Sequence, residues 1–228
     1  MIELFIASLA FVALHAVPSM PLRARLVRMM GAKVYSALYS VLSLVLLWAM
    51  IQAYSANLPR ELFWELGDAG RGIMALVLAL GFVLVIAGAL MANPSSFMMG
   101  GAGAIGSQEP AHGILRVTRH PMMMGIGLWA LAHMVARPEP GAAIFFGSLA
   151  LTAIGGAWLQ DQRKRQEIGD AWERLQKVTS FLPFGAILTG RNRLAIGEIW
   201  WRVVLGLAAW AAFIFYHGTI IGVSAMGF

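Results

Sequence analysis

The stretch VYSALYSVLSLVLLWAMIQAY (Val34–Tyr54) contains no charged side chain over its whole length. An α-helix rises about 1.5 Å per residue and the hydrocarbon core of a bilayer is about 30 Å thick, so a spanning helix needs about 20 apolar residues. A helix also pairs its backbone polar groups internally, which a membrane requires because lipid offers them no partner. The stretch therefore predicts a transmembrane helix.

Similar apolar stretches lie on both sides of this one. Four are long enough to span a membrane: Ile2–Met20, Gly72–Ala92, Gly141–Gln160 and Trp200–Val223. A shorter one, Met122–Ala136, reaches only about 22 Å as a helix, so it must continue, tilt or lie sunken in the membrane.

The composition agrees with a protein surrounded by lipid. Of the 228 residues, 59% are hydrophobic and 12% are charged, and the mean hydropathy is +0.73. This is more apolar surface than a soluble core of this size can bury, so membrane lipid is the expected partner. We predict an all-α fold, a polytopic transmembrane bundle of about six helices with a short fourth span, forming one integral membrane domain over residues 1–228.

The chain contains no cysteine, which excludes disulfides, thiolate catalysis and thiolate ligation of a metal or heme within it. The N-terminal stretch lacks the basic start and the small-residue cleavage site of a secretory signal. We therefore interpret it as a retained first span.

The basic residues are distributed unevenly between the predicted loops. A net charge of +6 is compatible with nucleic acid, but Lys and Arg in short loops beside apolar spans set membrane orientation instead. Thirteen of the seventeen follow the first, third and fifth spans: Arg23, Arg25, Arg28, Lys33, Arg116, Arg119, Arg163, Lys164, Arg165, Arg174, Lys177, Arg191 and Arg193. The positive-inside rule predicts a multi-pass protein of the bacterial inner membrane, with both termini periplasmic and no nucleic-acid partner.

Two of the predicted cytoplasmic segments are long. Asn93–His120 includes a portion too glycine-rich for a stable helix, which we expect to loop around a site. Its GxGxxG-like spacing follows no strand and does not indicate nucleotide binding. In Asp161–Leu194, charged residues with Trp172 and Leu175 predict an amphipathic cytoplasmic helix at the membrane surface, ending near Pro183; a solvated basic face is the alternative.

Histidines are the main candidates for chemistry, because ionisable side chains inside membrane spans are costly and usually point into the bundle. His15, His133 and His217 fall within predicted spans. Two neutral imidazoles from different helices, flanking an apolar pocket, form the ligand set of a b-type heme. The competing interpretation is that each histidine bonds a neighbouring carbonyl or hydroxyl.

Three motifs carry a resemblance to a known family: GILRVTRHPMMMGIGLWALAH (Gly113–His133), GAW (Gly156–Trp158) and PFGAILTGR (Pro183–Arg191). They resemble the NnrU family, which includes plant and bacterial 15-cis-zeta-carotene isomerases. The resemblance implies a membrane enzyme holding heme b between His15 and His133, both catalytic, with the reduced iron promoting a cis-to-trans change in a small hydrophobic polyene.

The chain departs from that pattern at two places. Ala130 replaces a cysteine found three residues before the second histidine in the plant enzymes, so exchange of a histidine for a thiolate ligand is impossible here. His217 is followed by Gly218 where the family has proline, which weakens an inherited role for this histidine.

Two other functions stay open at this point. Another branch of the family is associated with denitrification, which implies a heme-binding accessory or sensor protein for a nitrogen-oxide gas such as nitric oxide. A more distant resemblance, carried by Arg119–Gly125 with Gln160 and Asp161, is to isoprenylcysteine carboxyl methyltransferases, which implies transfer of a methyl group from S-adenosylmethionine.

The remaining candidate site residues lie before the fourth span. His112, Arg116 and Arg119 are predicted partners of the heme propionates, with anchoring of the span as the alternative role for the two arginines. The predicted topology puts His15 nearer the cytoplasmic side and His133 nearer the periplasmic side, so they share an iron only if the fourth span is sunken or the heme lies flat. His120 is the alternative partner for His15.

Overall fold

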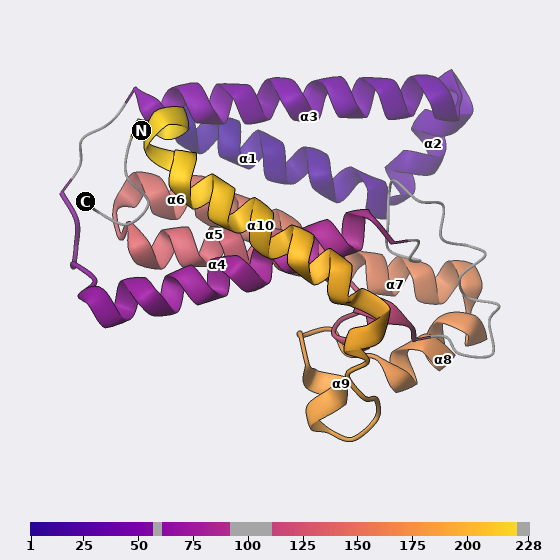
Figure 1. The fold of residues 1–228 in the computed structure, drawn as a ribbon. Helices are drawn as coiled ribbons and strands as arrows, with labels where there is room; N and C mark the ends of the chain where they lie inside the picture. Colours follow the sequence, from indigo (N-terminus) through magenta and orange to yellow (C-terminus); the bar gives the residue numbers. More distant parts are fainter. Residues whose placement is uncertain (57–60, 92–110, 223–228) are drawn as a thin grey trace. The chain divides into compact units, whose positions relative to one another are not determined.

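The computed structural model describes residues 1–56, 61–91 and 111–222 (Figure 1). This part of the chain is all-α and contains no strand, as predicted. Five helical segments in it are long and apolar enough to cross a membrane, and the shorter apolar helix α5 (Pro121–Ala136) is the predicted short fourth span.

The helices follow one another along the chain in a fixed order. The first half of the chain holds α1 (Ile2–Ala16), the 3₁₀ turn η1 (Val17–Ser19), α2 (Pro21–Met30), α3 (Ala32–Ser55) and α4 (Asp68–Ala89). The second half holds the 3₁₀ turn η3 (Gly113–Arg116), α5, α6 (Pro140–Ala150), the π turn η4 (Leu151–Gly155), α7 (Gly156–Ile168), α8 (Asp170–Val178), α9 (Gly185–Leu188) and α10 (Ile196–Ile221).

Proline and glycine mark several helix ends. Pro21 and Pro140 stand at the first position of α2 and α6, where a missing N–H costs nothing. Gly31, with φ +81°, separates α2 from α3, a backbone conformation that other residues rarely adopt. The fifth span runs without a break from Pro140 to Ile168 through the π turn, a local widening that is common at functional sites.

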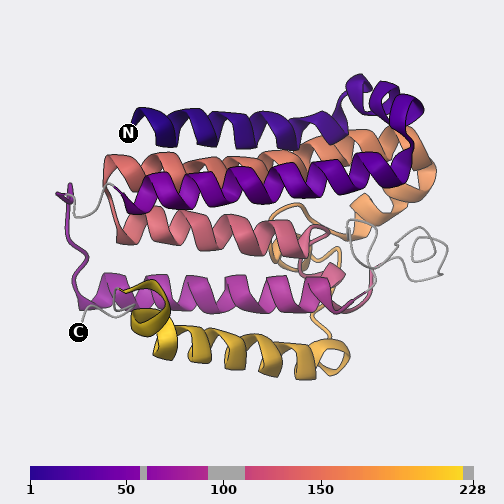
Figure 2. The same cartoon turned by 90° about the horizontal axis from the view of Figure 1, so that it is seen from above.

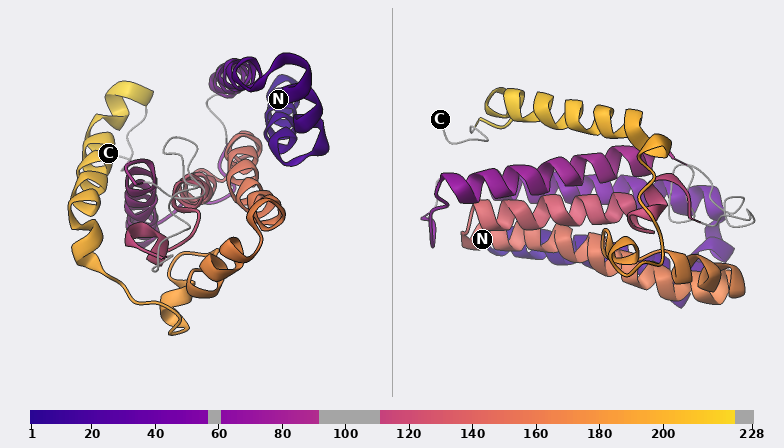
Figure 3. Two further views of the ribbon diagram at one scale, coloured as in Figure 1. Left: turned by 90° about the vertical axis from the view of Figure 1, so that its right-hand side faces the viewer. Right: turned by 60° about the horizontal axis from the view of Figure 1, so that its bottom comes forward.

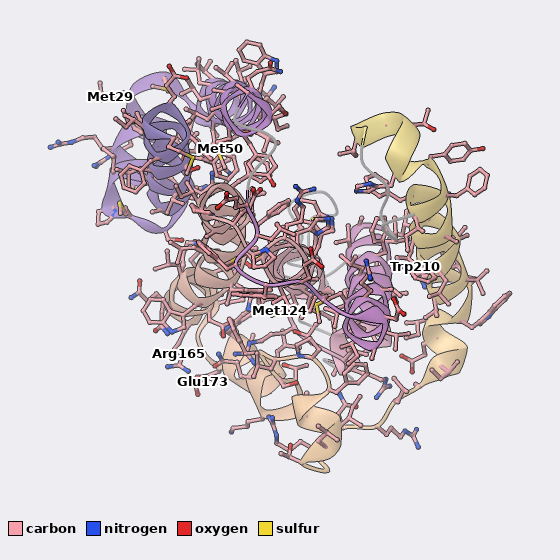
Figure 4. The ribbon with its side chains drawn as sticks, turned by 90° about the vertical axis from the view of Figure 1, so that its left-hand side faces the viewer. Met29, Met50, Met124, Arg165, Glu173 and Trp210 are labelled. Carbon is pink, nitrogen blue, oxygen red and sulfur yellow. The ribbon has the colours of Figure 1, made fainter. Side chains whose placement is uncertain are left out.

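The chain divides into two compact units. Unit 1 comprises Met1–Leu66 and Ala130–Arg163. In it α1 packs against α3 and α6. Met50 of α3 is fully buried inside the unit, whereas Met29 of α2 is exposed on its outside (Figure 4).

Unit 1 has two distinct ends, visible in Figure 2. At one end, α3 and α5 finish and α1 and α6 begin; it includes the turn of residues 137–139, so we name it the 137–139 end. At the other, the α2 end, α1 finishes and α2 leads into α3.

Unit 2 comprises Gly67–Trp129 and Lys164–Phe228. Here α10 lies along α4 (Figure 3). A Cβ added at Gly206 of α10 would come within 2.6 Å of the Val83 Cα, and one added at Gly125 of α5 within 2.6 Å of the Gly81 carbonyl oxygen. Small residues therefore let these helix backbones approach closely, as is usual between membrane helices.

The predicted amphipathic helix is α8, preceded by Gly169 at φ +47°. Trp172 and Leu175 are 0% and 1% exposed, so protein rather than lipid covers the apolar face. Arg165 and Glu173 project outward from α7 and α8 (Figure 4). The glycine-rich portion expected to loop around a site lies outside the described residues.

Candidate functional site

His15 lies in the last turn of α1, at the α2 end of unit 1. Its Nδ1 is 2.8 Å from the carbonyl oxygen of Phe11. A carbonyl can only accept a hydrogen bond, so Nδ1 carries the proton and the neutral ring keeps its lone pair on Nε2. Aromatic rings surround it: the Phe11 centroid lies at 4.1 Å and the Tyr39 centroid at 5.5 Å.

His133 lies in the last turn of α5, at the 137–139 end of the same unit. Its ring stacks on Phe146 of α6 with a centroid distance of 4.8 Å. Phe146 in turn meets Tyr54 of α3, edge to face at 5.8 Å. The Tyr54 hydroxyl donates to Oε1 of Glu139 over 2.9 Å, and this carboxyl is only 1% exposed.

The structure does not bring His15 and His133 together. Tyr39 contacts His15, and Tyr54 contacts the Phe146 ring on which His133 stacks. These two tyrosines of α3 are fifteen residues apart, which is about 22 Å along a helix axis. Two imidazoles that share one iron have their nitrogens roughly 4 Å apart, twice the roughly 2 Å of a typical metal–imidazole bond. The contacts within unit 1 therefore place the two histidines at opposite ends, as the predicted topology already indicated.

The two histidines therefore do not fit a single heme b as its two axial ligands in this arrangement. A backbone carbonyl that holds Nδ1–H is the usual way in which a protein orients a metal-ligating histidine and leaves Nε2 for the metal. Within residues 1–56, 61–91 and 111–222, no three His, Asp or Glu side chains gather as they would to hold a bare metal ion.

The other predicted site residues belong to unit 2, where they contact other groups of the protein. Arg116, 7% exposed, donates from Nη2 and Nε to the Glu198 carboxylate at 2.9 and 3.0 Å, and from Nη1 to Asn192 at 3.0 Å. The Gly113 N–H donates to the same carboxylate. Arg116 therefore joins η3 to the start of α10.

Arg119 and His120 pack against the segment that follows α8. The Arg119 N–H donates to the Ser180 carbonyl at 3.0 Å, and its guanidinium lies 5.6 Å from the Phe181 ring centroid. His120, 1% exposed, lies with its ring centroid 5.6 Å from Phe181 and 6.2 Å from Trp172. His112 precedes η3, and its carbonyl accepts the Leu115 N–H at 3.1 Å.

Three polar residues on or beside α1 and η4 were not singled out as site residues from the sequence. Arg163 of α7 donates to the Pro18 carbonyl at 3.1 Å, which puts a cation beside the end of α1. The hydroxyls of Ser8 in α1 and Thr152 in η4 are buried without a hydrogen-bond partner in the described part of the chain. Ser8 shares the periodicity of Phe11 and His15, which was the only signal available for it.

Comparison with known proteins places the chain in a family. The sequence profile described as "NnrU protein" matches residues 3–225, nearly the whole chain. The chain belongs to the NnrU family. Over 82 residues this NnrU protein is 42% identical to the protein named "15-cis-zeta-carotene isomerase, chloroplastic" of Zea mays and 40% identical to its namesake of Arabidopsis thaliana.

The two relatives share only part of their length with this NnrU protein. The matched segment covers 36% of the NnrU chain and 22% of each relative. No solved structure matches the chain significantly.

Proposed function

We propose that this NnrU protein is a membrane-embedded enzyme that converts a 15-cis polyene such as zeta-carotene to its trans form, using heme b carried on His15. Two relatives bearing the isomerase name support the reaction class. We also propose that it lies in a bacterial inner membrane with its basic segments cytoplasmic.

The observation that carries the proposal is the hydrogen bond from His15 Nδ1 to the Phe11 carbonyl. It fixes the tautomer, holds the ring in one orientation and leaves the lone pair on Nε2, the atom that would bind a metal. Heme, when bound there, supplies an iron centre that interacts with a double bond and eases rotation about it. The aromatic rings of Phe11 and Tyr39 provide an apolar environment compatible with both a porphyrin and a polyene.

The exterior of unit 1 suits an apolar substrate dissolved in the bilayer. On α1, Ile2, Phe5, Ile6 and Leu9 are between 56% and 77% exposed. Such side chains are stable only in lipid, which is also where a hydrocarbon polyene concentrates. The protein and this substrate therefore occupy the same phase, and no aqueous route to His15 is needed.

The test is conversion of 15-cis-zeta-carotene by the purified, heme-loaded, reduced protein in darkness, since light itself isomerises polyenes. We expect the trans product with the wild-type protein and none with His15→Ala. His217→Ala is the matched control, because it removes a histidine from another span, and it should retain conversion. Absence of product from the heme-loaded wild-type protein would overturn the isomerase proposal.

A further inference from the structure

We propose that α2 is a docking surface for anionic phospholipids. In this surface Arg25 and Arg28 hold the lipid phosphate, and Leu22 and Met29 contact the acyl chains. The helix lies between two of the candidate spans, α1 and α3, at one end of unit 1 (Figure 1). A short amphipathic helix that joins two adjacent spans lies at the level of the lipid headgroups. Binding of lipid there requires neither heme nor the isomerase reaction.

The cations of this surface are not neutralised by the protein. Four basic residues in and just after α2 are exposed: Arg23, Arg25, Arg28 and Lys33. None of them takes part in an ion pair in the part of the chain that the structure describes, and residues 4–60 of the sequence contain no Asp or Glu. Clustered Lys and Arg beside a membrane span attract anionic lipids. The charge of α2 therefore needs an anion from outside the chain.

Helix geometry places exposed apolar side chains beside these cations. Arg28 lies three residues after Arg25 on α2. Leu22 lies three residues before Arg25, and Met29 lies four residues after it. Residues at these spacings are neighbours on a helix surface, so the four side chains share one side of α2. Leu22 is 44% exposed and Met29, which projects outward, is 75% exposed (Figure 4).

This combination of side chains favours a phospholipid over an acidic protein segment or a free anion. Arginine binds phosphate through two parallel N–H donors, so Arg25 and Arg28 suit the headgroup. A free anion would leave Leu22 and Met29 exposed to water, which is unfavourable. A phospholipid carries its phosphate and its acyl chains in one molecule, and these two parts adjoin as the cations and the apolar side chains of α2 do.

Backbone breaks on both sides keep α2 separate from the two spans. Pro18 lies in η1 before it, and Gly31, with φ +81°, ends it. The helix also contacts α3, so its position is set by the fold before any lipid binds. Arg163 donates to the Pro18 carbonyl at 3.1 Å and adds a further cation near the start of α2.

The experiment measures binding of phosphatidylglycerol and of phosphatidylcholine to the full-length protein in a neutral detergent, with bound lipid counted by native mass spectrometry. The test variant is Arg25→Gln/Arg28→Gln. The matched control, Arg174→Gln/Lys177→Gln, removes the same charge from exposed positions of α8. Each Lys or Arg near an anionic lipid surface strengthens attraction about fivefold, so the test variant should lose about 25-fold in affinity for phosphatidylglycerol. Its affinity for phosphatidylcholine should change little, and the control should bind both lipids as the wild type does.

A second variant tests the apolar half of the surface. Leu22→Gln/Met29→Gln keeps every cation and should also weaken binding of phosphatidylglycerol, because the acyl chains lose their contacts. Equal affinity of the wild type for the two lipids, or equal losses in the α2 and α8 variants, would overturn the proposal. Displacement of the lipid by inorganic phosphate would indicate a site for a free anion, and displacement by polyglutamate would indicate a surface for an acidic protein. Either displacement would overturn it as well.

Discussion

At the scale of single residues, the hydrogen bond between Tyr54 and Glu139 tests the packing of the 137–139 end. Tyr54→Phe removes a donor from a carboxyl that is 1% exposed. Loss of one partner of a buried polar group costs about 1–3 kcal/mol, so the variant should unfold at a lower temperature in detergent. Tyr35→Phe is the control, because the Tyr35 hydroxyl has no partner in the described residues, and it should leave stability unchanged. Equal loss in both variants would contradict this account.

The Arg116–Glu198 ion pair offers a second residue-scale prediction. Arg116→Lys keeps the charge but loses the planar fork that contacts Glu198 and Asn192 together. Because the Glu198 side chain is 37% exposed, we expect a loss of about 1–3 kcal/mol, typical of hydrogen bonds to a charged group and below that of a fully buried ion pair. Asp68→Asn, which breaks an exposed ion pair with Arg71, should leave the stability nearly unchanged, because solvent screens such pairs.

The same variant distinguishes two roles for Arg116. In the structure its guanidinium is occupied by Glu198, whereas the sequence predicted a heme propionate as its partner. Arg116→Lys should therefore lower thermal stability while leaving heme content per folded protein at the wild-type value. Loss of heme from a protein of unchanged stability would restore the propionate role.

At the scale of elements, the close approach of α4 and α10 depends on one small residue. Gly206→Ala would put a Cβ 2.6 Å from the Val83 Cα, a backbone contact that cannot move aside without shifting a helix. Overpacking of this kind costs about 1–3 kcal/mol. Gly197→Ala on the same helix is the matched control: nothing lies within 4 Å of its added Cβ, and alanine favours the helix by up to about 1 kcal/mol. A reduced melting temperature for position 197 rather than 206 would refute this packing.

The helices themselves were predictable because a membrane span needs only length and apolar composition, and Val34–Tyr54 within α3 is an example. Their partners were less predictable. Trp172 and Leu175 predict an apolar helix face, but the sequence pattern is the same whether lipid or protein covers that face. The structure shows that protein covers it. The π turn of Leu151–Gly155 was not predicted from the sequence, which reads there as one continuous apolar span.

At the scale of the whole molecule, the position of each site histidine along its helix could be predicted from the sequence. The residues that each histidine contacts in the folded protein could not. Counting residues along the spans placed His15 and His133 toward opposite faces of the membrane, and unit 1 has them at opposite ends. The expectation that both histidines bind the same iron came from the family resemblance. It stays a prediction, and the arrangement of unit 1 does not favour it. Arg163 was missed because its contact with Pro18 joins residues far apart in sequence.

Membrane orientation is a property of the whole molecule that can be tested by cysteine labelling. The test is simple because the sequence contains no cysteine of its own. A single cysteine can be introduced at Arg25, exposed on α2, or at Glu65, exposed before α4; both positions lie in unit 1, and no native thiol interferes. The segment around Arg25 also carries Arg23 and Arg28, whereas Glu65 lies close to Glu61. The positive-inside rule therefore places position 25 in the cytoplasm and position 65 in the periplasm.

A membrane-impermeant maleimide should label the Glu65→Cys variant in intact cells and the Arg25→Cys variant only after the inner membrane is opened. The reverse pattern would invert the topology and put His15 nearer the periplasm. Labelling of both in intact cells would mean that the two ends of unit 1 do not lie on opposite sides of a membrane. The expected pattern would place His15, in the turn of α1 just before the basic helix α2, within about one or two turns of the cytoplasmic surface. Arg163, which donates to the Pro18 carbonyl just after α1, would then lie near the same surface.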